Sequence, residues 1–280
     1  MTLQQVYKKA YDKLQQNAQV QETCAFDLSC LFEHMLGVSR YRLPLIGNQE
    51  ADEAKARVFF SLCKRYEAGE PLQYLIGEWE FYGLPFSVGE GVLIPRPDTE
   101  TLVETALALL KDVKRPVVAD LCSGSGCVAI AIAHERPDAQ VFALELSDAA
   151  FPYLIGNISR NHAKVTALHH DVRTPPALPA LDLVVSNPPY IPREEMDTLQ
   201  IQVTHEPEMA LFGGEDGYDF YRELPKLYLP LLKKDGAIAF EVGYNQAQTV
   251  KQLLLSSGYT DINTQKDLAG IVRVVSGRKL

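Results

Sequence analysis

Short apolar runs alternate with helical patterns from residue 117 onward, and this alternation constrains the fold more than any other feature of the sequence. The predicted strands are Val117–Leu121, Val141–Leu146, Val165–His169, Leu183–Ser186, Ala237–Val242, Thr260–Thr264 and Ile271–Val275. The predicted helices include Asp98–Leu110, Val128–His134, Ala149–Asn161, Tyr218–Leu232 and Gln246–Ser256. Strands that alternate with helices form a mostly parallel sheet that helices cover on both faces. The sequence therefore predicts an α/β domain.

The first seventy residues show a different pattern, in which apolar residues recur at helical spacing. The three apolar stripes are Val6, Ala10 and Leu14; Ala25, Leu28, Phe32 and Met35; and Ala54, Val58, Leu62 and Tyr66. From Leu72 onward the apolar residues alternate, with Tyr82-Gly83 between two such arms, which indicates a β-hairpin. We predict a helical bundle over residues 1–70, a β-hairpin linker over residues 71–95 and the α/β domain over residues 96–280.

The charge of the chain is unevenly distributed. The sequence has 27 Lys and Arg against 36 Asp and Glu, a formal net charge of −9. Residues 1–70 hold 9 basic and 9 acidic residues, so the remaining residues hold 18 basic and 27 acidic ones and carry the whole −9. Binding to a phosphate backbone needs clustered Lys and Arg. We therefore expect no direct nucleic-acid substrate.

Membrane and metal binding are also not expected. The amino terminus lacks the apolar core of a signal peptide, and the apolar run Cys127–Ala133 is far shorter than a membrane span. The five cysteines include no CxxC pair, which favours reduced packing residues over disulfides or a zinc site. The pattern is that of a cytoplasmic protein with no membrane partner and no bound metal.

A glycine loop follows the first strand of the α/β domain, where ligands of open parallel sheets bind. Gly124 and Gly126 lie between this strand and the next helix, and a glycine lets a ligand approach the backbone. Asp120 lies at the tip of the same strand, and Glu145 ends the next strand, 25 residues later. An acidic residue in that position accepts hydrogen bonds from ribose hydroxyls. The loop therefore predicts a nucleoside-containing cofactor.

Two cofactors fit a ribose-binding acid. A nicotinamide dinucleotide favours the full G-x-G-x-x-G run, but the third glycine is absent after Gly126. S-adenosylmethionine has no phosphate and fits better, with Asp120 facing its amino-acid or sulfonium end and Asp171 placed for the adenine amino group. The predicted cofactor contacts of these loops are Asp120, Ser123, Gly124, Gly126, Glu145 and Asp171.

The fourth strand leads directly into Asn187-Pro188-Pro189-Tyr190. Two prolines stiffen this segment, so the Asn187 side-chain oxygen and the Pro188 carbonyl can accept both hydrogens of a planar NH₂ group. Such a clamp would turn a weakly nucleophilic nitrogen toward a methyl donor, and orientation would supply most of the rate. Tyr190 would form an aromatic wall. We predict Asn187, Pro188 and Tyr190 as catalytic and the whole segment, with Pro189, as substrate-binding.

These motifs together resemble the peptide chain release factor N5-glutamine methyltransferases, the PrmC/HemK family, over essentially the full length of the chain. The resemblance rests on Leu93 to Glu100 (LIPRPDTE), Asp120 to Gly126, Glu145, Ser186 to Ile191 (SNPPYI), His205-Glu206-Pro207 and Ala210-Leu211. It implies a class I S-adenosylmethionine-dependent methyltransferase fold, Rossmann-like, with a seven-stranded mostly parallel sheet. It also implies that residues 96–280 are the catalytic domain and that residues 1–70 help to dock the release factor.

The family resemblance also implies the substrate and the contacts. The substrate would be the glutamine of the Gly-Gly-Gln motif of class I release factors, whose N5 methylation supports translation termination. Asn187, Pro188 and Tyr190 would hold the glutamine amide, while Gly124, Glu145 and Asp171 bind the cofactor. Arg96 and Thr99 would flank the methionine end of the cofactor, and Asn187 is expected to contact it too.

One departure from the family pattern leaves alternatives open. Family loops often read DxGTGxG, whereas Cys122 replaces the first glycine here, as it does in a related family that methylates a ribosomal protein. A ribosomal protein glutamine is therefore an alternative substrate. The NPPY motif is shared with adenine-N6 DNA methyltransferases, which the acidic charge disfavours. A binding module without turnover is disfavoured because both acceptors and both acidic ligands are present.

Overall fold

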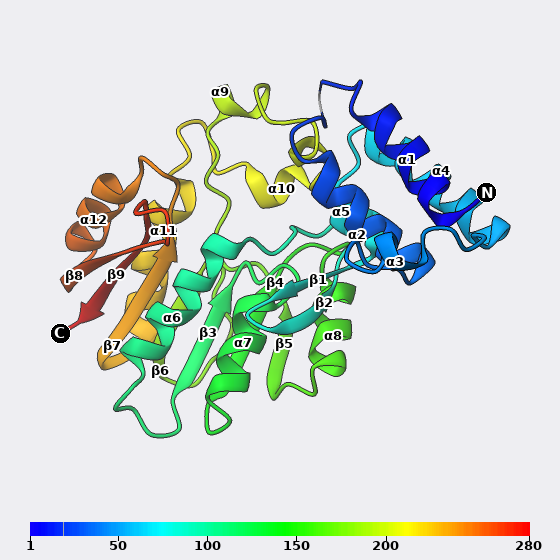
Figure 1. Ribbon diagram of the computed structural model, residues 1–280. Coiled ribbons are helices and arrows are strands. Elements are labelled where there is room, and N and C mark those ends of the chain that lie inside the picture. The colour runs from blue at the N-terminus through cyan, green and yellow to red at the C-terminus, as the bar shows by residue number, and fades with distance from the viewer. Residues whose placement is uncertain (19) are drawn as a thin grey trace. The chain divides into compact units, whose positions relative to one another are not determined.

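A computed structural model describes residues 1–18 and 20–280 (Figure 1). These residues form two compact units, Met1–Glu78 with Gln200–His205, and Trp79–Leu199 with Glu206–Leu280. The first unit thus includes a short segment from far along the chain. The functional boundaries that we expect at residues 70 and 95 stay predictions.

The first unit is a helical bundle, as predicted. Its helices are α1 (Leu3–Leu14), α2 (Cys24–Leu36), α3 (Leu43–Ile46), α4 (Glu53–Glu67), α5 (Leu72–Ile76) and the 3₁₀ helix η2 (Val203–His205). The rings of Phe32 and Phe59 meet edge to face in the core, 5.3 Å apart. The predicted stripe is wrong at Ala54, which is exposed, and at Val58, which is 48% exposed, because α4 instead turns Phe59 and Cys63 inward with Leu62 and Tyr66.

The β-hairpin is present, although its predicted stretch begins with helix α5. Strands β1 (Glu78–Phe81) and β2 (Leu84–Ser87) form a two-stranded sheet. Tyr82 and Gly83 between them have φ values of 54° and 71°. Two left-handed residues give the turn the twist that a two-residue hairpin needs. The sequence therefore located the hairpin correctly but missed the helical turn before it.

The second unit contains a seven-stranded sheet. Its strands are β3 (Val117–Leu121), β4 (Gln140–Glu145), β5 (Val165–His169), β6 (Leu181–Ser186), β7 (Leu232–Glu241), β8 (Tyr259–Lys266) and β9 (Val272–Lys279). The order across the sheet is β5-β4-β3-β6-β7-β9-β8. Neighbours from β5 to β7 are parallel, and β9 is antiparallel to both β7 and β8. The predicted mostly parallel α/β sheet is confirmed.

Helices cover both faces of this sheet. The helical segments of the unit are η1 (Pro97–Thr99), α6 (Glu100–Leu109), α7 (Cys127–Glu135), α8 (Phe151–Arg160), α9 (Arg193–Met196), α10 (Glu208–Leu211), α11 (Asp219–Tyr228), η3 (Leu229–Leu231) and α12 (Ala247–Ser256). One core lies under α6, α7 and α8, and a second under α11 and α12. Across the described residues, no helix combines the length and apolar character that a membrane crossing requires.

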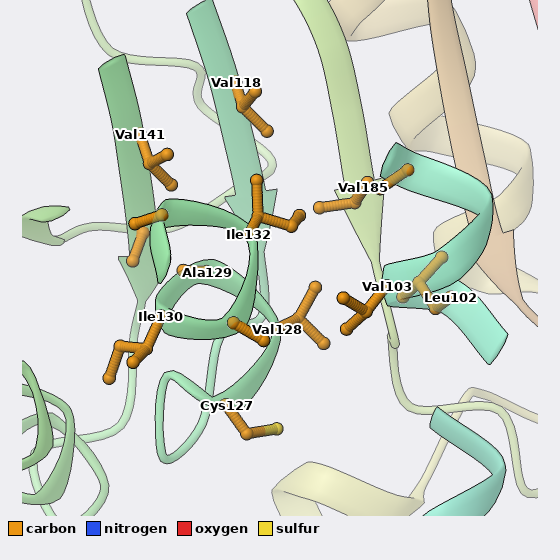
Figure 2. Packing of buried hydrophobic residues seen from close by; sticks show 14 of the residues in the cluster. Leu102, Val103, Val118, Cys127, Val128, Ala129, Ile130, Ile132, Val141 and Val185 are labelled. Atoms are coloured by element: carbon orange, nitrogen blue, oxygen red, sulfur yellow. The ribbon is translucent and has the colours of Figure 1, made fainter. Parts of the chain in front are cut away.

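Helix α7 is the most buried helix of the sheet's first face. All of its residues from Cys127 to Ala133 are buried, which explains why it is apolar on every side. Figure 2 shows its side chains between Val118 and Val141 of the sheet and Leu102 and Val103 of α6. This packing fixes the start of α7, and therefore the glycine loop that leads into it from β3.

Candidate active site

A cavity of about 520 Å³ lies where β3, β4, β5 and β6 end. Because these strands are parallel, the loops after them meet at one edge of the sheet. The predicted site residues that line the cavity are Arg96, Thr99, Asp120, Ser123, Gly124, Glu145, Asp171, Asn187 and Pro189. Gly126, Pro188 and Tyr190 are not among its lining residues. The structure thus brings most of the predicted residues to one cavity.

Three residues of the glycine loop after β3 have left-handed backbone conformations. The φ values of Cys122, Gly124 and Gly126 are 58°, 54° and 82°. A Cβ on Gly124 would meet no atom within 4 Å, whereas a Cβ on Gly126 would lie 2.5 Å from the Leu154 Cδ1 atom. Gly124 therefore leaves space on the cavity side, while Gly126 lets α7 begin close against α8.

Glu145 ties this loop to the end of β4. Its Oε2 atom accepts the Gly124 N–H at 2.7 Å, and its Oε1 atom accepts the Ser147 N–H at 2.7 Å. The residue is 8% exposed and lines the cavity. A carboxylate offers about four lone-pair sites, so both oxygens can accept further hydrogen bonds. Glu145 is a fixed pair of acceptors that a ribose could use.

Asp120 is the second acid on this side, and it is 1% exposed. Its Oδ2 atom accepts the Ala129 N–H at 3.2 Å. Burial raises the pKa of Asp120 to about 7, opposed by hydrogen bonds from Ser123 and Ala129 and reinforced by the charge of Glu145. A nearby cation would lower this pKa again. The carboxyl is therefore suited to a positively charged ligand.

Asp171 follows β5 and lines the cavity. Its Oδ1 atom accepts the Arg173 N–H at 2.9 Å, and its carbonyl accepts the N–H and hydroxyl of Thr174. These bonds shape a tight turn whose side chain is half-buried. The turn holds the acid at the cavity, where it can also face a ligand.

Asn187 follows directly after β6, which lies beside β3 on the side away from β4. Its side-chain N–H donates to the Thr99 hydroxyl oxygen at 3.3 Å, and both residues line the cavity. Thr99 itself is 2% exposed. With its nitrogen bonded to Thr99, the amide of Asn187 keeps its oxygen as the free acceptor. This is the orientation that a substrate NH₂ group requires.

Glu241 lies behind this pair and was missed by the sequence analysis. It ends β7, the parallel neighbour of β6, and is 3% exposed. Burial raises its pKa to about 7, while side-chain hydrogen bonds with Thr99 and Asn187 lower it. Its Oε2 atom has no hydrogen-bond partner among the described residues. The available signal was an acid at the end of an apolar strand, the same signal that identified Glu145.

Tyr190 packs against the core under α11 and α12 and is not among the residues that line the cavity. Burial raises the pKa of its phenol. Its carbonyl accepts a hydrogen bond from the Gln246 side chain at 2.9 Å. A Cβ on Gly213 would lie 2.6 Å from the Tyr190 Cα atom, so the returning loop passes very close. The backbone around Tyr190 is thus held on several sides.

The loop that follows NPPY is pinned to the segment before η1. Glu206, 5% exposed, forms an ion pair with Arg96, and its Oε2 atom accepts the Ile94 N–H at 3.0 Å. Burial raises the pKa of Glu206, against the lowering effect of Arg96. Residues 207–210, which follow Glu206, line the cavity. The sequence assigned no role to Glu206, because its partners lie 110 and 112 positions away.

Solved structures show the same fold. A methyltransferase from Pyrococcus furiosus aligns with a TM-score of 0.52 and 19% identity, over 71% of this chain and 90% of that one. The catalytic domain of hMettl16, solved with the MAT2A 3′UTR hairpin 6, aligns with a TM-score of 0.57 and 14% identity, over 81% and 82%. At these identities the likeness concerns the fold alone.

The fold and the cavity define a class I methyltransferase, an enzyme whose cofactor is S-adenosylmethionine. Family models for the PrmC N-terminal domain and the methyltransferase small domain match residues 5–77 and 98–208. Relatives named release factor glutamine methyltransferase are 38% identical in Fusobacterium nucleatum and Geobacter sulfurreducens, over 90% and 92% of this chain and 73% and 90% of theirs. One from Caulobacter vibrioides is 34% identical over 100% of this chain and 97% of its own length. The chain belongs to the release factor glutamine methyltransferase family.

Proposed function

We propose that this enzyme methylates the side-chain amide nitrogen, N5, of the glutamine in the Gly-Gly-Gln motif of peptide chain release factors. The observation that carries the proposal is the orientation of Asn187, which leaves an amide oxygen at the cavity as an acceptor. The names of relatives that share 34% to 38% of their residues with this chain support the release factor as substrate.

The cavity fits the cofactor. Its volume of about 520 Å³ lies within the range of small-molecule sites, and Gly124 leaves open space beside the backbone. Glu145 would accept hydrogen bonds from the ribose, and Asp171 would face the adenine amino group. Asp120, with Arg96 and Thr99, would lie at the amino-acid end. S-adenosylmethionine supplies, when bound, an electrophilic methyl group on a sulfonium.

Orientation of the glutamine amide is the contribution of this chain to the reaction. The Asn187 side-chain oxygen and the Pro188 carbonyl would each accept one amide hydrogen, which turns the nitrogen lone pair toward the methyl group. Pro188 is buried and is not among the residues that line the cavity, so the role of its carbonyl stays a prediction. No strong base is needed before transfer, because the nitrogen can lose its proton afterwards. Tyr190 as an aromatic wall stays a prediction.

The division of labour between the two parts of the chain is part of the proposal. Residues 1–70 would help to dock the release factor, the hairpin of residues 71–95 would link, and residues 96–280 would catalyse. The hairpin and the catalytic part together, residues 71–280, carry the whole net charge of −9, which favours a protein over a nucleic acid as substrate. Release factors work with ribosomes, so we propose a cytoplasmic enzyme without a membrane partner.

Labelled S-adenosylmethionine tests the proposal. The full chain is incubated separately with a release factor, with the same factor carrying Gln→Ala in its Gly-Gly-Gln motif, with ribosomal proteins and with DNA. We expect label on the intact release factor alone, and mass mapping should place it on the glutamine. Label on a ribosomal protein or on DNA, with none on the release factor, would replace the proposed substrate.

A further inference from the structure

Glu241 is a buried acid that the proposed mechanism does not use. It lies at the end of β7, beside Asn187 at the end of β6, and does not line the cavity. Buried carboxyl groups normally have all their hydrogen bonds made, yet the Oε2 atom of Glu241 lacks a partner among the described residues. A group so costly to bury calls for a role beyond packing.

The protonation state of Glu241 decides which of Glu241, Thr99 and Asn187 donates each hydrogen bond and which accepts it. Thr99 and Asn187 are the side chains whose hydrogen-bonding groups act on the Glu241 carboxyl. An ionised carboxylate only accepts hydrogen bonds, so a Thr99 hydroxyl that bonds to it would donate its proton. The Thr99 oxygen is then available to accept, and it accepts the N–H of Asn187 at 3.3 Å. A direct bond from Asn187 to the carboxylate would again engage its nitrogen. In both arrangements the Asn187 nitrogen is bonded, and its oxygen stays available as an acceptor at the cavity.

We propose that Glu241 is a positioning residue. Through Thr99, it fixes the orientation of the Asn187 amide so that the oxygen, and not the NH₂ group, meets the substrate nitrogen. This inference rests on the proposed function, because it assumes that the substrate presents an NH₂ group. A protonated Glu241 could donate to Thr99, which could then donate to the Asn187 oxygen. Asn187 would in that state present its own NH₂ group to the substrate, and the clamp would fail.

The surroundings of Glu241 permit both protonation states near neutral pH, since its pKa is raised to about 7. Arg273 of β9 favours the ionised form, and Asp98 of η1 opposes it. Tyr190, Tyr221 of α11 and Cys127 of α7 are the other titratable groups that sense its charge. The Tyr221 hydroxyl donates to the Glu241 main-chain carbonyl at 2.8 Å, which holds the strand end.

The first experiment measures kcat at saturating S-adenosylmethionine as a function of pH, for the wild type, Glu241→Gln, Thr99→Val and Thr99→Ser. We expect wild-type kcat to rise as pH rises through about 7, because ionised Glu241 orients Asn187. Glu241→Gln and Thr99→Val should lower kcat by roughly 10- to 100-fold and remove this rise, since a misplaced orienting group costs on that order. Thr99→Ser, which keeps the hydroxyl, should keep the rise of kcat with pH that Thr99→Val loses. Glu104→Gln, an exposed charge change on α6, is the matched control.

The second experiment needs no substrate. Infrared difference spectra of wild type against Glu241→Gln isolate the titrating carboxyl, and its midpoint is compared in Thr99→Val and Thr99→Ser. Loss of the Thr99 donor should move the midpoint to higher pH, whereas the serine variant should leave it in place. An unmoved midpoint in Thr99→Val overturns the inference. A wild type that methylates no release factor contradicts the proposed function instead, while an active wild type with unchanged kcat in Glu241→Gln contradicts only the role of Glu241.

Discussion

The two sides of the cavity each contain a buried acid, but they place it differently. Asp120 lies at the end of β3 and lines the cavity itself, beside Glu145. Glu241 lies at the end of β7 and does not line the cavity, although Thr99 and Asn187, which do line it, lower its pKa. Burial raises the pKa of both acids to about 7. A buried carboxyl group thus faces the cofactor directly on one side, as Asp120, and orients a neighbouring amide on the other side, as Glu241.

The difference follows from what each side has to recognise. The cofactor is a cation, so a carboxylate in direct view stabilises it by charge. The substrate amide is neutral, and a carboxylate facing it would accept its hydrogens without selecting the reactive geometry of a planar group. A neutral amide oxygen in a fixed orientation does this better, and the charge is kept one side chain behind it. Substitutions on the two sides should therefore separate cofactor binding from methyl transfer.

Asn187→Ala should give the largest effect of these substitutions. We expect kcat to fall by about 100-fold or more, because the substrate nitrogen loses an orienting acceptor. The affinity for S-adenosylmethionine, measured by calorimetry, should stay close to that of the wild type. Methyl transfer to a release factor at nearly the wild-type rate would show that the amide clamp is wrong.

Glu145→Ala should affect cofactor binding and leave the rate of methyl transfer nearly unchanged. Loss of its charged acceptor should weaken binding of S-adenosylmethionine by about 1 to 3 kcal/mol. At saturating cofactor, kcat should change little, because the amide side is intact. Glu135→Ala, an exposed acid at the end of α7, is the control for charge. An unchanged dissociation constant in Glu145→Ala would remove this residue from the cofactor site.

Asp120 predicts a pH dependence of cofactor affinity. Its pKa is raised to about 7 without a ligand, so protonated Asp120 must lose its proton to face the cationic cofactor. Affinity should therefore rise as pH rises toward 7, by at most about tenfold per pH unit, and then level off. Calorimetry on the wild type and on Asp120→Asn measures it, and the slope should vanish in the variant. A slope that persists there would assign the titration to another group.

The sequence predicted the parts of this site that lie within one strand and its loop. Asp120 and Glu145 each end an apolar strand, and Gly124 follows directly, so their meeting at one cavity required only parallel neighbours. Asn187 followed from the same rule. Local pattern and the geometry of parallel sheets were sufficient for these residues.

Other features depended on which strands and loops become neighbours. Glu241 stands at a strand end too, but only the sheet order puts β7 beside β6. Glu206 pairs with Arg96, which is 110 residues away in the sequence, and the periodic pattern of apolar residues does not predict such a contact. Tyr190 packs against the core under α11 and α12, and its own segment of sequence does not show that contact. Tertiary packing decided each of these.

Cys122 lies in the loop between the two sides, and it should give the smallest effect. Its φ of 58° is left-handed, which costs a residue with a Cβ about 1 kcal/mol. Cys122→Gly relieves this strain but loses a partly buried side chain and adds freedom to the unfolded chain. Cys122→Ala loses the sulfur and keeps the strain.

The pair of Cys122 variants therefore isolates the backbone effect. We expect Cys122→Gly to have a free energy of unfolding about 1 kcal/mol above that of Cys122→Ala, which urea denaturation can resolve. Both variants should keep cofactor affinity and kcat near wild-type values, because Gly124 and Glu145 still shape the loop. If the alanine variant were as stable as the glycine variant, the backbone of this loop would have to relax out of the left-handed region. The two sides of the cavity would then be joined by a flexible loop rather than by a fixed one.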